Sequence, residues 1–235
     1  MLEAKQLTKR YGEKLALDSL DLQIAPGEIY CLVGANGAGK TTTISLFLDF
    51  ISPTSGSALV NDICIAEQPS LAKRHLAYIP ETVSLYGQLS GVENLDYFST
   101  LAGHRLSKDE KLNLLERAGL RGEDAKRRAS GYSKGMRQKV GIAIALAKNA
   151  NAILMDEPTS GLDPQAANEL SLLVKQLGEQ QTTVLMATHD LYRAKEVASR
   201  IGIMRQGQLV ETVKPSEVSH AELEAIALRN MQFQQ

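Results

Sequence analysis

The sequence predicts an α/β protein with a largely parallel sheet at its core, an N-terminal antiparallel β subdomain and an inserted α-helical subdomain. Short apolar runs alternate with amphipathic helical patterns, as in proteins whose helices pack on a parallel sheet. Residues 1–28 instead alternate polar and apolar side chains, which is typical of half-exposed antiparallel strands. Helical signals dominate from about residue 84 to residue 146.

The candidates for parallel strands are four short apolar runs, Ile29–Val33, Ile153–Met155, Thr183–Ala187 and Ile201–Met204. Each of the first three ends against polar residues at the expected carboxyl edge of the sheet. Open α/β sheets bind their ligands at this edge, so we expect the chemistry of the protein there.

The antiparallel part is expected to be discontinuous in the sequence and to cover about residues 1–28 and 57–79. Leu2–Leu7 and Leu20–Ile24 show the alternation of half-exposed strands. Ser57–Val60 is a similar stretch that could pair with them.

Two capping boxes mark the helical insertion. Ser90 and Ser107 are each followed three residues later by a glutamate, and the two side chains can satisfy free amides of a first helical turn. We expect one domain over residues 1–235, with the helical subdomain at about 84–146 and the core in the remainder. The tail at 215–235 has room for at most one short helix.

Composition and charge exclude several classes of protein. The formal net charge is −1, from 26 basic and 27 acidic side chains, so no global field attracts nucleic acid and none is expected as a partner. Two cysteines are too few for a disulfide framework and indicate a reducing, cytoplasmic setting. No segment approaches the roughly 18 apolar residues of a membrane span, and the N-terminus lacks a signal-peptide core. Any membrane attachment must therefore come from another chain.

A glycine-rich segment follows the first apolar run directly. It reads Gly34-Ala35-Asn36-Gly37-Ala38-Gly39-Lys40-Thr41 and matches the phosphate-binding loop, whereas a plain glycine-rich turn would not need so complete a motif. Loop amides and the N-terminus of the next helix would face phosphate oxygens. Lys40 would contact the β- and γ-phosphates of a bound nucleotide, and the Thr41 hydroxyl would ligate Mg²⁺. The phosphate-site candidates are Gly34, Asn36, Gly37, Ala38, Gly39, Lys40, Thr41 and Thr42.

Two carboxylates, Asp156 and Glu157, end the second apolar run. Adjacent strand residues point to opposite faces, so the two acids can have different tasks. Asp156 is expected to orient Mg²⁺, directly or through water, and Glu157 to polarise the water that attacks the γ-phosphate. Without a phosphate loop in the same domain, an apolar strand that ends in Asp-Glu would more often be a capped strand end. After a phosphate loop, the two acids indicate a hydrolytic pair.

The segment Tyr132-Ser133-Lys134-Gly135-Met136, here called the signature segment, resembles the motif of ATP-binding-cassette (ABC) ATPases that most often reads Leu-Ser-Gly-Gly-Gln. The phosphate loop, the signature segment, the acidic strand and His189 follow in the order of that family, so the resemblance covers essentially the whole chain. It implies a P-loop NTPase (RecA-like) core that uses ATP and Mg²⁺. It also implies a head-to-tail dimer, in which Ser133 and Gly135 contact the γ-phosphate of ATP held by a second ABC subunit. We expect a homodimer, and a heterodimer stays open.

The resemblance assigns roles to three further residues. Tyr11 would stack on adenine, the alternative being a surface aromatic in a turn. His189 would be the switch residue that contacts the γ-phosphate and would complete a catalytic set with Glu157 and Lys40, the alternative being a structural histidine at a strand end. Asp163 would lie at the dimer interface, and it also fits a helix N-cap.

The sequence departs from the common family pattern in two motifs. Lys134 stands where the signature usually has a glycine and Met136 where it has a glutamine, which adds positive charge beside a phosphate site. Glu81 stands where most members carry the glutamine that senses Mg²⁺ and the attacking water. We include Glu81 with Thr41 and Asp156 as a candidate metal contact. Both departures resemble the branch of the family that serves ABC-2 type exporters.

The expected function is therefore that of a transport ATPase whose ATP-driven dimerisation moves a separate membrane permease. Through that permease the protein would lie on the inner, cytoplasmic face of the cell membrane. Its docking surface is expected to include the apolar residues Val83, Leu85, Tyr86, Leu89 and Tyr97, burial within the helical subdomain being the alternative. A soluble ABC ATPase acting on a macromolecular partner stays open, although a single cassette without sustained heptads argues against most such proteins. The intact motifs also argue against a non-hydrolysing regulatory subunit.

Overall fold

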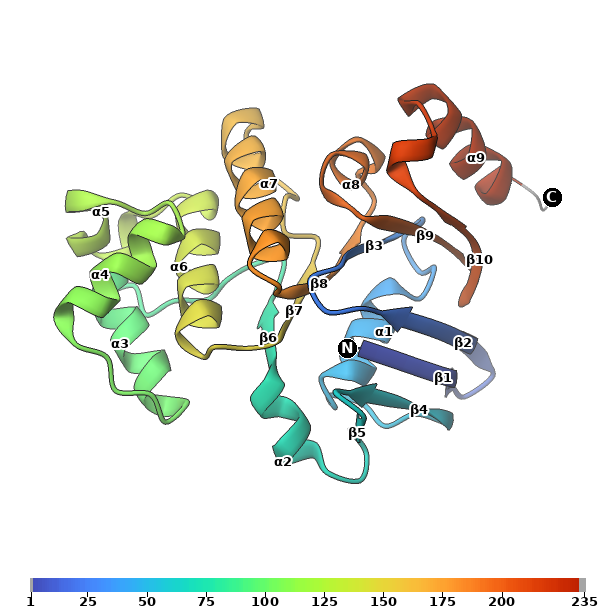
Figure 1. Ribbon diagram of the computed structural model, residues 1–235, viewed down its shortest axis with the longest axis horizontal. Helices are drawn as coiled ribbons and strands as arrows, with labels where there is room; N and C mark the ends of the chain where they lie inside the picture. Colours follow the sequence, from blue (N-terminus) through green and yellow to red (C-terminus); the bar gives the residue numbers. More distant parts are fainter. Residues whose placement is uncertain (1, 233–235) are drawn as a thin grey trace.

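We describe the protein from a computed structural model, which covers residues 2–232. The molecule contains two sheets, and the helical insertion lies to one side of them (Figure 1). The strands are β1 (Leu2–Tyr11), β2 (Lys14–Ile24), β3 (Ile29–Val33), β4 (Ser55–Val60), β5 (Ile63–Cys64), β6 (Leu76–Ile79), β7 (Ala152–Asp156), β8 (Thr183–Thr188), β9 (Arg200–Arg205) and β10 (Gln208–Val213). The α-helices are α1 (Lys40–Phe47), α2 (Pro69–Ala72), α3 (Gly91–Leu101), α4 (Lys108–Arg117), α5 (Gly122–Lys126), α6 (Lys134–Ala147), α7 (Pro164–Glu179), α8 (Leu191–Val197) and α9 (His220–Gln232). Short 3₁₀ helices span Lys73–His75, Ala129–Gly131 and Pro215–Glu217.

A six-stranded sheet in the order β10-β9-β3-β8-β7-β6 forms the centre of the molecule. β3 pairs in parallel with β8 and β9, and β7 pairs in parallel with β6 and β8, which confirms the α/β class. Every residue of β3, β7 and β8 is buried, as expected for parallel strands with both faces covered. All four apolar runs predicted as parallel strands lie in this sheet.

Two strands of the central sheet differ from the expectation. Residues 57–79 are expected in the antiparallel part, but β6 pairs with β7, so the antiparallel part ends at β5. The physical reason is burial, because Leu76, Ala77 and Ile79 form a nearly continuous buried run and not an alternating one. The prediction also missed β10, which turns back on β9 through Gln206 and Gly207, both at positive φ.

The antiparallel sheet has the order β2-β1-β4-β5 and covers α1. Ile44 and Phe47 of α1 are fully buried and share one core cluster with Leu2 of β1 and Leu32 of β3. The helix therefore lies between the two sheets. This packing brings the loop before α1 close to the hairpin that joins β1 and β2.

The helical insertion consists of α3, α4, α5 and α6. Both predicted capping boxes are present, at Ser90 for α3 and at Ser107 for α4. A second core cluster continues from this insertion into the layer between the central sheet, α7 and α8. The expected helix in the tail is α9, which buries Leu223 and Ala227.

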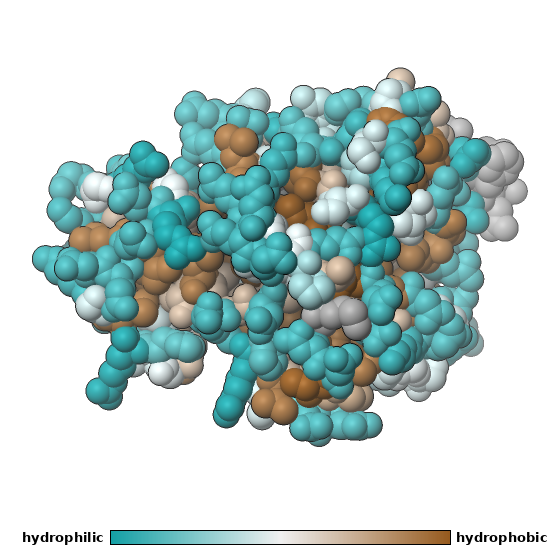
Figure 2. Space-filling model, in the orientation of Figure 1, coloured by the Kyte–Doolittle hydropathy of each residue, from teal (hydrophilic) through white to brown (hydrophobic). Residues whose placement is uncertain are grey.

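Hydrophilic residues cover most of the face drawn in Figure 2, and hydrophobic residues form separate patches among them. Within residues 2–232, none of the helices has the length and the apolar character needed to cross a membrane.

Candidate functional site

The loop between β3 and α1 lines a cavity at the carboxyl edge of the central sheet. Gly39 precedes α1 with a φ of 109°, and a β-carbon at Gly34 would stand 2.4 Å from the Met204 carbonyl oxygen, so both positions require glycine. The first turn of α1 has neither a side-chain cap nor an acidic residue. Its amides and the positive end of the helix dipole can therefore receive an anion.

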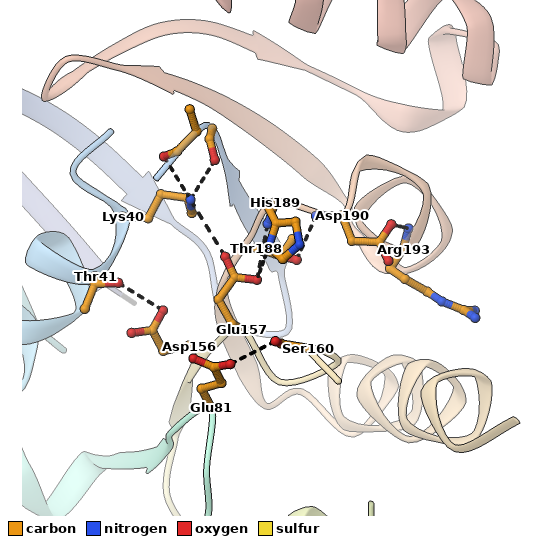
Figure 3. A network of polar contacts seen from close by, with 12 residues as sticks. Lys40, Thr41, Glu81, Asp156, Glu157, Ser160, Thr188, His189, Asp190 and Arg193 are labelled. Carbon is orange, nitrogen blue, oxygen red and sulfur yellow. Dashed lines mark hydrogen bonds and ion pairs between the residues drawn. The ribbon is translucent and has the colours of Figure 1, made fainter. Parts of the chain in front are cut away.

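Lys40 is a buried charged side chain at the start of α1. Its ammonium donates hydrogen bonds to the carbonyl oxygens of Gly34 (2.6 Å) and Ala35 (3.3 Å) and lies 3.8 Å from Glu157 Oε1. Burial lowers the pKa of Lys40, and the neighbouring carboxylates of Glu157 and Asp156 oppose this shift. The lysine charge thus lies between the loop and the acidic end of β7 (Figure 3).

Asp156 and Thr41 form the second contact between α1 and β7. The Thr41 hydroxyl donates a hydrogen bond of 3.2 Å to Asp156 Oδ1. Burial raises the pKa of Asp156, while the hydrogen bond from Thr41 opposes the shift. Among the described residues no group of three or more His, Cys, Asp or Glu side chains could hold a metal ion. A pair of hard oxygen donors nevertheless suits Mg²⁺, because this ion keeps water and phosphate oxygens as most of its ligands.

Glu157 follows β7 in a left-handed conformation, with a φ of 46°. Its amide donates to the Ala187 carbonyl oxygen of β8. Carboxylate oxygen Oε2 accepts a hydrogen bond of 2.8 Å from His189 Nδ1 and one of 3.3 Å from the His189 amide, while Oε1 faces Lys40. The two acids therefore turn to different partners, Asp156 to Thr41 and Glu157 to His189, as Figure 3 shows.

The cavity has a volume of about 310 Å³. Its lining residues are Tyr11, Lys14, Ala16, Asn36, Gly37, Ala38, Gly39, Lys40, Thr41, Thr42, Glu81, Asp156 and Glu157. The structure thus brings together most of the predicted loop residues, the acidic pair, Tyr11 and Glu81. Lys14 and Ala16 line the cavity as well and are not among the predicted site residues. Lys14 is placed there by its pairing with Tyr11 across the hairpin, and no sequence motif marks either residue.

Other predicted site residues lie outside this lining. Gly34 contributes its carbonyl oxygen to Lys40, and His189 is linked to the cavity through Glu157. Ser133 caps α6 by accepting a hydrogen bond from the Met136 amide (3.2 Å). Gly135 is buried, and a β-carbon there would lie 3.1 Å from Ala166 Cβ of α7. The signature segment therefore forms a second helix N-terminus, and none of its residues lines the cavity of its own chain.

The family model, the relatives and the solved structure that resemble this chain agree with one another. A family model described as ABC transporter matches residues 17–160. The chain is 37% identical to the bacitracin transport ATP-binding protein BcrA of Enterococcus faecalis over 220 residues, which cover 93% of this chain and 70% of BcrA. It is 35% identical to the probable multidrug ABC transporter ATP-binding protein YbhF of Escherichia coli over 93% of its own length, but it spans only 38% of YbhF. It also matches the ATP-binding cassette MJ0796, whose dimeric post-hydrolysis structure is bound to ADP and Pi, with a TM-score of 0.80, 27% identity and coverage of 92% of this chain and 99% of that one.

Proposed function

The chain belongs to the ABC transporter family, and from this membership we propose that it is the ATP-binding and ATP-hydrolysing subunit of a transporter, of the ABC-2 exporter type. The observation that carries the proposal is the cavity in which the loop, Lys40, Asp156 and Glu157 meet. The two departures of the sequence from the common family motifs support the exporter branch. Similarity to relatives named for multidrug and bacitracin transport supports it as well.

We propose that the cavity holds ATP with its phosphates on the loop. The loop amides, the dipole of α1 and the Lys40 ammonium supply the positive field. Thr41 and Asp156 would hold Mg²⁺, which when bound offsets negative charge on the phosphates. Glu81 lines the cavity but has no hydrogen bond to either of them, so we assign the metal to Thr41 and Asp156 first.

Glu157 is the proposed general base. Its carboxylate is oriented by two hydrogen bonds from His189 and lies beside Lys40, which would bind the γ-phosphate. This arrangement can accept a proton from a water that attacks the γ-phosphorus. The same contact supports the role of His189 as a switch residue. A phosphate that binds the imidazole of His189 would also change the position of the Glu157 carboxylate, which is hydrogen-bonded to that imidazole.

We also propose that two chains, identical ones in the simplest case, enclose ATP between them. The signature segment carries the Ser133 cap and the amides of α6, but none of its residues lines the cavity of its own chain. A helix N-terminus of this kind fits a phosphate supplied by another subunit. The dimeric post-hydrolysis structure of the similar cassette supports this arrangement.

Replacing Tyr11 with alanine should weaken ATP binding and leave the binding of inorganic triphosphate unchanged. Tyr11 lines the cavity and the residue is 47% exposed, so its ring can stack on a base, and a stacked base is worth about 1–3 kcal/mol. We therefore expect a loss of roughly 5- to 150-fold in a calorimetric titration with ATP. Tyr11→Phe, which keeps the ring, is the matched control, and equal losses for ATP and triphosphate would rule out stacking.

The proposed docking surface for the permease includes an aromatic cluster of Tyr86, Tyr97 and Phe98. The rings of Tyr86 and Tyr97 are 4.8 Å apart between centroids, and the two residues are 50% and 44% exposed. The buried Asn94 side chain holds the loop through the backbone amide and carbonyl of Tyr86. Val83 is different, because it is buried against Gly141, so for this residue the expectation of an exposed docking contact is wrong.

The test of the transport function is purification of the chain from its native membranes, where a polytopic membrane protein should co-purify. Tyr86→Asp and Tyr97→Asp should abolish this co-purification and spare ATP binding, because a charge placed in the cluster opposes burial by an apolar partner. Tyr192→Asp, at an equally exposed tyrosine of α8, is the control. Retained co-purification of both variants would place docking elsewhere. The absence of any membrane partner would favour a soluble ABC ATPase.

A further inference from the structure

The carboxylate of Glu81 joins three segments that are distant in the sequence. The residue follows β6 and lines the same cavity as Asp156 and Glu157. Its Oε1 accepts a hydrogen bond of 2.8 Å from the hydroxyl of Ser160 and lies 3.7 Å from Lys134 Nζ. Ser160 precedes α7, and Lys134 is the first residue of α6. One side chain therefore connects the cavity to the signature segment.

Gln138 holds the backbone of the same loop. Its Nε2 donates to the carbonyl oxygens of Pro80 (3.2 Å) and Glu81 (3.0 Å), and the residue is 1% exposed. Gln138 lies four residues after Lys134, so the two side chains leave α6 on the same face. Helix α6 thus contacts the Glu81 loop in two ways. The neutral amide of Gln138 binds its main chain, and the ammonium of Lys134 pairs with the carboxylate of Glu81.

Lys134 occupies a position that helix electrostatics disfavours. It begins α6, where the free amides and the dipole are already positive, and the first turn contains no acid to offset them. The ammonium lies over the turn at Gly161, 3.6 Å from the place of a β-carbon there. The ion pair with Glu81 supplies the missing negative charge.

The negative charge of Glu81 is unfavourable for binding an anion in the cavity. Three carboxylates, Glu81, Asp156 and Glu157, line the space proposed for the phosphates, and like charges weaken the binding of an anion. Lys40 lies beside Glu157, and Thr41 donates to Asp156. For Glu81 the positive partner is Lys134, which comes from the signature segment.

We propose that Lys134 and Glu81 form a matched pair, in which the lysine neutralises and positions the carboxylate at the rim of the ATP cavity. The inference rests on the proposed function, because it presumes phosphates in this cavity. Lys134 is then a positioning residue for the ATP site of its own chain. The two departures from the common motifs compensate for each other, and ATP affinity depends on the signature segment before a second chain binds.

The test is a double-mutant cycle on the full chain, read as the affinity for ATP with Mg²⁺ in calorimetry. Lys134→Met should weaken binding by about two- to fivefold, the range expected for a partly exposed ion pair. Glu81→Gln should bind at least as well as the wild type, and the double variant should bind like Glu81→Gln. Lys134→Arg should retain the wild-type affinity. Lys126→Met removes a different surface ion pair, with Glu123, and should change nothing.

Several outcomes would overturn the pair. One is an unchanged ATP affinity in Lys134→Met. Another is that Lys134→Met causes an equal loss of affinity in the wild-type and Glu81→Gln backgrounds, which would mean that the lysine acts on the nucleotide directly. A purely structural lysine would lower thermal stability without any dependence on residue 81. The loss in Lys134→Met should also diminish at high salt, because exposed charges are screened. A wild-type chain that binds no ATP would contradict the proposed function itself, before any variant is compared.

Discussion

Replacing Lys40 with alanine is expected to weaken ATP binding on the order of 10²-fold, because a hydrogen bond to a charged group is worth about 1.5–3 kcal/mol. The substitution removes the ammonium that lies between the loop carbonyls and Glu157 and leaves the loop amides in place. The negative charges of Asp156 and Glu157 would then repel the phosphates without the Lys40 ammonium to offset them. The loss is measured by calorimetric titration with ATP and Mg²⁺.

The matched control is Lys73→Ala, which removes a lysine whose ion pair with Asp49 lies outside the cavity. Its ATP affinity should equal that of the wild type. Thermal unfolding of both variants separates a lost contact from a lost fold, since Lys40 also bonds the loop that precedes its helix. An unchanged affinity in a folded Lys40→Ala protein would count heavily against the phosphate-loop assignment.

The parts of the site that the sequence predicts correctly are encoded within a few residues of each other. The loop is such a case, because Gly37 and Gly39 adopt positive φ values of 84° and 109°, a local backbone conformation that glycine adopts readily. The capping boxes at Ser90 and Ser107 are equally local, and so is the cap of α7 by Asp163. For these elements a short pattern determines the backbone, and tertiary packing agrees with it.

The features that the sequence does not reveal depend on contacts between distant segments. β6 joins the central sheet because β7, more than 70 residues later in the chain, offers it an edge that is then buried. The contact of Glu81 with Lys134 joins the loop after β6 to the first residue of α6 in the helical subdomain, and no pattern links their positions. Each of the two residues departs from its motif in the sequence, but only the structure shows that they are in contact. The same holds for Lys14, which enters the cavity through the hairpin.

Substituting Glu157 with glutamine is expected to leave ATP binding intact and to slow hydrolysis by a factor on the order of 10²–10⁴, the usual contribution of a general base. Glutamine keeps the size of the side chain and can still accept a hydrogen bond from His189. It cannot take a proton from the attacking water. Phosphate release with ATP and Mg²⁺ measures the loss, and Glu179→Gln, at an exposed position on α7, is the control.

The same variant should accumulate as a dimer when ATP and Mg²⁺ are present, whereas the wild type should be mainly monomeric without nucleotide. ATP on the loop of one chain would contact Ser133 and Gly135 of the other, so a nucleotide that is not hydrolysed keeps the two chains together by mass action. Light scattering measures the association. Adding Ser133→Arg should abolish it, because the bulky side chain removes the cap of α6 and obstructs the N-terminus that would receive the phosphate.

The two readouts separate the causes of a negative result. Wild-type hydrolysis in Glu157→Gln would show that another group is the base and that the acidic pair is wrongly assigned. Slow hydrolysis without a dimer would mean that two identical chains do not enclose the nucleotide. A different partner subunit would then complete the site, or Lys134 and Met136 would weaken the contact that the signature segment makes across the interface. Restoring the common residues at these two positions distinguishes the last two cases, because only a contact weakened within the homodimer would be regained.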